Sequence, residues 1–127
     1  MTTPPRLRVL IVDDHRDAAS ALMRLVKAEG HEVTIETSGQ EAIRTAEGFQ
    51  PDVILLDINL PHITGHEVAR RIRASDWGRK VVLIAVSAFG DEENRKKSQA
   101  AGCDLHVTKP ILNVAEFLTT LPTRDGN

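Results

Sequence analysis

The segment at residues 53–57 limits the possible folds more than any other part of the chain. It begins with the apolar run Val53 to Leu56, whose first two side chains are β-branched, and it ends on the carboxylate of Asp57. A short, uninterrupted apolar run is typical of a strand that is buried on both faces of a parallel sheet. Pro61 follows soon afterwards, so the strand cannot simply continue. Because ligands of open α/β sheets bind at the carboxyl ends of strands, the sequence predicts a functional carboxylate at Asp57.

The rest of the chain alternates between strand-like and helix-like segments. Strands are predicted at residues 7–12, 31–36, 53–56, 81–86 and 105–108. Helices are predicted at residues 16–29 and 91–101 and behind the capping residues Ser38, Thr64 and Asn113, the last of them reaching Leu121. Gly30 and Gly102 stand where two of the helices should end. This alternation predicts an α/β fold with a five-stranded parallel sheet, strand order 2-1-3-4-5, and helices on both faces.

Length and composition favour one small domain in a reducing compartment. We expect a flexible arm at residues 1–5, a single domain at 6–121 and a polar tail at 122–127. The formal net charge of −2 gives no electrostatic basis for nucleic-acid binding. The chain has no apolar run of the ~20 residues that cross a bilayer, and no signal-peptide core. A single cysteine, Cys103, excludes an internal disulfide, so we expect a soluble cytoplasmic protein.

Polar side chains follow four of the five predicted strands, at Asp13 and Asp14, Asp57, Ser87 and Lys109. The carboxyl ends of parallel strands share one sheet edge, so we expect these side chains to converge on one crevice. Three carboxylates about 4 Å apart would repel by ~4 kcal/mol per pair at an effective dielectric of 20, and one lysine cannot offset that. A hard divalent cation can, and oxygen ligands of this kind suit Mg²⁺.

The chain has five histidines, and they are scattered over separate predicted elements. This scatter does not favour a zinc or copper site. We expect His15 and His62 at the rim of the acidic crevice.

Taken together, these residues resemble the receiver domain of two-component response regulators. The residues that carry the resemblance are Asp13-Asp14, the run Asp57-Ile58-Asn59-Leu60-Pro61 with Gly65, Ser87-Ala88, and Lys109-Pro110. The resemblance covers about residues 6–121, and the combination is highly specific although each piece alone is not.

The resemblance implies a role for each of these positions. Asp57 would accept a phosphoryl group, forming an acyl phosphate. Asp14, Asp57 and the backbone carbonyl of Asn59 would ligate Mg²⁺ directly, and Asp13 would do so through a water. Lys109, Ser87 and Ala88 would bind the phosphoryl group. The Lys109–Pro110 peptide bond is a candidate for the cis form.

Four positions are implied to switch or tune the domain. Ser87 would draw its loop towards the phosphoryl group, while Asn59 and Phe89 would set the rate of hydrolysis. His106 stands where family members usually hold Tyr or Phe, and the chain has no tyrosine. That difference leaves open whether His106 switches or is only a solvent-facing strand residue. Histidine at this position resembles receivers of hybrid kinases and phosphorelays.

The function implied by the resemblance is signalling. The domain would take a phosphoryl group from a sensor histidine kinase or a histidine phosphotransfer protein and change its binding to a downstream protein target. It would catalyse only its own phosphorylation and dephosphorylation, so we do not expect an enzyme with a separate substrate. Since the receiver fills the chain, we expect no output domain, and no binding to nucleic acid or membrane.

Three other functions are compatible with parts of the sequence. A flavodoxin-like electron carrier would need a hydroxyl- and glycine-rich phosphate loop where this chain has Asp13-Asp14-His15-Arg16, and more aromatic residues to stack on the flavin. A metal-dependent phosphatase with an aspartyl nucleophile would need a D-x-D-x-T motif that the same segment does not fit. A non-phosphorylated interaction module of the same fold would have no need of the acidic set and Lys109.

Overall fold

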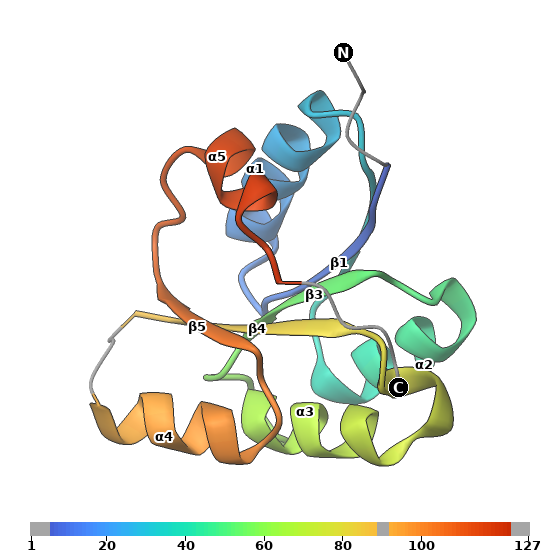
Figure 1. The fold of residues 1–127 in the computed structure, drawn as a ribbon, viewed down its shortest axis with the longest axis vertical. Coiled ribbons are helices and arrows are strands. Elements are labelled where there is room, and N and C mark those ends of the chain that lie inside the picture. The colour runs from blue at the N-terminus through green and yellow to red at the C-terminus, as the bar shows by residue number, and fades with distance from the viewer. Residues whose placement is uncertain (1–5, 89–91, 123–127) are drawn as a thin grey trace.

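The computed structural model describes residues 6–88 and 92–122 (Figure 1). The remaining residues lie outside this description, and with them the expected N-terminal arm, Phe89, the expected first residue of the 91–101 helix and most of the expected tail. The elements in chain order are β1 (Arg8–Val12), α1 (Arg16–Ala28), β2 (Glu32–Glu36), α2 (Gly39–Phe49), β3 (Val53–Asp57), α3 (Gly65–Ala74), the 3₁₀ helix η1 (Asp76–Gly78), β4 (Val82–Ser87), α4 (Glu92–Ala100), β5 (Leu105–Thr108) and α5 (Val114–Thr119).

The five strands form one parallel sheet in the order β2-β1-β3-β4-β5, as the sequence predicted. Helices α1 and α5 cover one face, and α2, α3 and α4 cover the other (Figure 1). The central strand β3 shows why its run is apolar throughout: Ile54 and Leu56 pack into the core under α2 and α3, while Val53 and Leu55 pack into the core under α1 and α5.

Local capping fixes where several helices begin and end. The side chains of Ser38, Thr64 and Asn113 each accept a hydrogen bond from the backbone N–H three residues later, as the capping boxes predicted. Gly30 and Gly102 adopt φ of +95° and +99°, the left-handed conformation that ends a helix at low steric cost.

Helix α5 ends at Thr119, before the predicted end at Leu121. Two hydroxyls explain the early end, because Thr119 Oγ1 donates to the Glu116 carbonyl and Thr120 Oγ1 donates to the Phe117 carbonyl. Pro122 then disfavours helical geometry at Leu121. No helix among residues 6–88 and 92–122 is long and apolar enough to cross a membrane.

Candidate functional site

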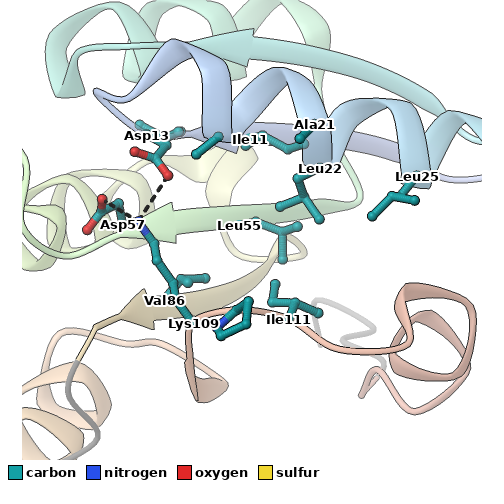
Figure 2. A pocket seen from close by; sticks show the side chains of 13 residues that line it. Ile11, Asp13, Ala21, Leu22, Leu25, Leu55, Asp57, Val86, Lys109 and Ile111 are labelled. Atoms are coloured by element: carbon teal, nitrogen blue, oxygen red, sulfur yellow. Dashed lines mark hydrogen bonds and ion pairs between the residues drawn. The ribbon is translucent and has the colours of Figure 1, made fainter.

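Two buried carboxylates and one lysine meet at the carboxyl edge of the sheet (Figure 2). Asp57 is the last residue of β3 and Asp13 follows β1, and they are only 4% and 7% exposed. The Lys109 ammonium lies between them, with Nζ 3.0 Å from Asp57 Oδ2 and 3.0 Å from Asp13 Oδ2. Neighbouring strands deliver both carboxylates, because β1 and β3 are paired in parallel.

The charge of Lys109 is stabilised by this arrangement. Burial by itself would lower the pKa of Lys109, but the hydrogen bonds to Asp13 and Asp57, together with their negative charges, raise it above its ordinary value. Lys109 therefore stays protonated at neutral pH. The Lys109–Pro110 peptide bond is cis, as expected.

The backbone holds the Asp57 carboxylate from the other side. Its Oδ1 accepts a hydrogen bond from the Asn59 N–H at 2.8 Å. Gly65 packs directly on the Asp57 backbone, since a Cβ built at position 65 would lie 2.3 Å from the Asp57 carbonyl oxygen. Only glycine fits there, and the contact fixes the loop after β3 against the strand.

Asp14 and His15 complete an acidic cluster at the open side of the site. One ligand atom from each of Asp13, Asp14, His15 and Asp57 lies within 4.8 Å of the others. His15 Nδ1 is 3.4 Å from Asp13 Oδ1 and 3.2 Å from Asp14 Oδ1, which places His15 at the rim as predicted. Three carboxylates with an exposed opening fit a hard cation such as Mg²⁺ by the chemistry of their oxygen donors. His62 lies in a separate hollow, with Ser38 to Gln40 and Ile63.

A mainly apolar cavity of about 310 Å³ extends from the two buried carboxylates along α1 (Figure 2). Its walls include Leu22 and Leu25 of α1, Leu55 of β3 and Ile111 after β5. The apolar wall removes water from one side of Asp57 and Lys109. It therefore strengthens the electrostatic interaction between their charges.

The remaining predicted site residues surround this centre. Ser87 ends β4, is 1% exposed and follows Val86, the register partner of Asp57, while Ala88 is exposed. The side chain of Asn59 is also at the surface.

His106 is half-buried and hydrogen-bonded, so it does not only face solvent. Its Nε2 lies 2.8 Å from Ser87 Oγ, and its Nδ1 lies 2.9 Å from Ser98 Oγ of α4. Helix α4 contacts the edge strand β5, so the half-buried ring lies between two buried hydroxyls. Sequence reasoning did not single out Ser98. Its one signal was that α4 offers no large apolar side chain to bury.

Comparison with known proteins identifies the family of the chain. The family profile described as the response regulator receiver domain matches residues 9–121. The polar-differentiation response regulator DivK of Brucella anthropi is 33% identical over 119 residues, which cover 94% of this chain and 96% of that protein. The solved receiver domain of the sensor histidine kinase PA1611 from Pseudomonas aeruginosa, with a magnesium ion coordinated in its active-site cleft, is 30% identical, with a TM-score of 0.80 over 91% of this chain and 93% of that one.

The chemotaxis protein CheY4 of Vibrio cholerae has the same fold, with a TM-score of 0.87 over 93% of this chain and 100% of that one at 23% identity. The family profile spans nearly the whole chain, and DivK aligns over almost its full length. The chain therefore belongs to the family of response regulator receiver domains, the signalling modules of two-component systems.

Proposed function

We propose that Asp57 accepts a phosphoryl group from a phosphohistidine of a partner protein, with Mg²⁺ held beside it. The observation that carries this proposal is the position of Lys109, whose ammonium lies 3.0 Å from both Asp13 Oδ2 and Asp57 Oδ2. A fixed cation next to a buried carboxylate suits a reaction that adds negative charge at that carboxylate.

In the proposed reaction, one Asp57 oxygen attacks the phosphorus and forms a P–O bond, while the P–N bond to the donor imidazole breaks. The imidazole leaves with the electron pair of that bond and takes up a proton. The Asn59 N–H, 2.8 Å from Oδ1, keeps the carboxylate oriented. Lys109 stabilises the charge on the phosphoryl oxygens, and Ser87 and Ala88 complete the phosphoryl-binding set.

The acidic cluster provides the proposed metal ligands. Asp14 and Asp57 would bind Mg²⁺ directly with the Asn59 carbonyl, and Asp13 would bind through a water. When bound, the ion neutralises charge on the transferring phosphoryl group. Asp13 is held by Lys109, whereas Asp14 is one-third exposed, so the two carboxylates differ in their freedom to reach a cation.

The proposed partners follow from this chemistry. A sensor histidine kinase or a histidine phosphotransfer protein supplies the phosphohistidine. A downstream protein then binds the phosphorylated and the unphosphorylated forms with different affinities. The protein acts on no separate substrate and catalyses only its own phosphorylation and dephosphorylation.

Labelling with radioactive acetyl phosphate tests the acceptor. The wild-type protein should be labelled with Mg²⁺ and not with EDTA, and Asp57→Asn should abolish labelling while the fold is kept. Asp76→Asn is the matched control, because the Asp76 side chain is 99% exposed, and it should label like the wild type. Undiminished labelling of Asp57→Asn would contradict the proposal, and no labelling of any form would favour a non-phosphorylated interaction module.

Calorimetric Mg²⁺ titration tests the metal ligands separately. Asp14→Ala should weaken binding more than Asp13→Ala, because only the first change removes a direct ligand. Equal affinities of the two variants would contradict this ranking.

A further inference from the structure

Four side chains from four different elements form a continuous hydrogen-bonded chain that leads away from the acidic cluster. Ser87 Oγ of β4 lies 2.8 Å from His106 Nε2 of β5. His106 Nδ1 lies 2.9 Å from Ser98 Oγ of α4, and Ser98 Oγ lies 2.8 Å from His66 Nε2 of α3. Both serines are 1% exposed, so bulk water does not compete for their hydroxyls.

The Ser98 hydroxyl limits how protons can be arranged along this chain. It carries one proton but faces a ring nitrogen of His66 and a ring nitrogen of His106. It can donate to only one of them, so the other ring must donate to Ser98. If both rings donated, the buried Ser98 proton would have neither nitrogen as an acceptor, which costs about 1–3 kcal/mol for a lost partner.

When both imidazole rings are neutral, the hydrogen bonds of this side-chain network can therefore run in either of two directions. In the first, His66 Nε2–H donates to Ser98, Ser98 donates to His106 Nδ1, and His106 Nε2–H donates to Ser87. In the second, every donation is reversed and the Ser87 proton is directed to His106 Nε2. Burial, and then the positive charge of Arg70, lower the pKa of His66, which keeps that ring neutral at pH 7.

A phosphoryl group on Asp57 would select between these directions. Its oxygens can only accept hydrogen bonds from a hydroxyl, so Ser87 must point its single proton at them. While its hydrogen bond to His106 is kept, Ser87 can do so only by accepting from His106 Nε2, which is the first direction. Ser87 directly follows the register partner of Asp57, so the last residue of the hydrogen-bond chain lies on the strand beside the proposed acceptor.

We propose that His66, Ser98 and His106 are positioning residues for phosphorylation of Asp57, through a hydrogen-bond chain that runs from His66 to Ser87 and directs the Ser87 proton at the phosphoryl group. This inference rests on the proposed phosphoacceptor function. The inference gives α4 a role in the reaction. Among the described residues, no hydrogen bond or ion pair joins this helix to Asp57 or to Lys109. The only buried residue of α4 is Ser98 itself.

Nitrogen-15 NMR of the two imidazoles tests the direction in the unmodified protein. The full chain is held phosphorylated with excess acetyl phosphate and Mg²⁺, and labelling of Asp57 is verified on the same sample. The first direction of the hydrogen-bond chain predicts that His66 and His106 both carry their proton on Nε2. A proton on Nδ1 of either ring, or a doubly protonated ring, would overturn the inference, whereas an unlabelled sample would instead count against the proposed function.

A double-mutant cycle tests whether Ser98 acts through Ser87. Ser98→Ala should slow labelling by acetyl phosphate about fivefold, the rate equivalent of one neutral hydrogen bond. The same change should have no further effect in a Ser87→Ala background. Ser20→Ala, a serine-to-alanine change in α1, should leave the rate unchanged.

Urea unfolding of each variant separates lost positioning from lost fold. No slowing by Ser98→Ala, or equal slowing with and without Ser87, would overturn the inference.

Discussion

Replacing Arg73 with methionine should destabilise the domain by about 4 kcal/mol, although Arg73 is not part of the proposed site. The Arg73 guanidinium donates to the carbonyls of Gly102, Gly78 and Val81 at 2.9, 2.8 and 2.6 Å, and to Asp104 Oδ2 at 2.8 Å. It thereby ties α3 to η1, to the start of β4 and to the loop before β5. Both charged side chains are 14% exposed.

The magnitude follows from the partners that methionine would leave behind. Three hydrogen bonds to backbone carbonyls at about 1 kcal/mol each, and the loss of the ion-pair partner of Asp104, which still accepts from the Leu83 N–H, sum to about 4 kcal/mol. This is within the 3–5 kcal/mol that is typical when one member of a buried ion pair is removed. Methionine keeps most of the aliphatic stem, so the loss reports on the polar contacts.

Urea denaturation of Arg73→Met and of the neighbouring Arg71→Met provides the comparison. Arg71 is 50% exposed and pairs with Glu67, so its loss should cost no more than about 1 kcal/mol. Asp104→Asn should recover part of the stability in the Arg73→Met background, because burying a neutral amide costs less than burying a carboxylate whose Arg73 counter-charge is gone. A loss below 1 kcal/mol for Arg73→Met would show that these four hydrogen bonds do not stabilise the domain as calculated.

Packing at Gly65 and in α4, and the charge of His66, can each be tested in the same way. Gly65→Ala should destabilise the domain and slow labelling, because its Cβ would lie 2.3 Å from the Asp57 carbonyl oxygen. The control Gly48→Ala, whose Cβ would have nothing within 4 Å, should be neutral or stabilising. Equal unfolding midpoints of the two variants would contradict this prediction. Amide exchange should be faster in α4 than in α1, since α4 buries only a serine, and equal protection would be inconsistent with that packing. The pKa of His66 is lowered from 6.5, so the unfolded chain binds more protons and stability should fall as pH drops below 6.5. His66→Gln should flatten that fall in urea titrations, and an unchanged pH dependence would show that His66 does not cause it. The ionisable groups that act on the ring are Arg70, His106 and Lys97.

The sheet could be predicted from sequence because each of its signals is local. The run at residues 53–56 is apolar on both faces, and the structure buries both faces of β3. Gly30 marks the end of one helix, and the capping residues Ser38, Thr64 and Asn113 mark the starts of three others. These helix ends depend only on the neighbouring backbone. The convergence of Asp13, Asp57 and Lys109 follows from the same pattern, because parallel strands bring their carboxyl ends to one edge.

The contacts that sequence could not reveal all depend on tertiary placement. Arg73 follows Arg70 and Arg71 in a polar stretch of α3, and its burial comes from carbonyls that distant segments supply. His106 lies on an edge strand, where its exposure depends on whether α4 covers it. The weak apolar pattern of α4 gave no indication of that cover, because the helix is held against His106 through the hydroxyl of Ser98.

Identification of the phosphorylated side chain tests the central proposal most directly. Borohydride reduces an aspartyl phosphate to homoserine, so reduction of the labelled full chain followed by peptide mass mapping locates the acceptor. Phosphorylation of Asp57 predicts homoserine at position 57 and unmodified aspartate at 13 and 14. Homoserine at 13 or 14, or label retained after reduction on a histidine such as His15, would contradict it.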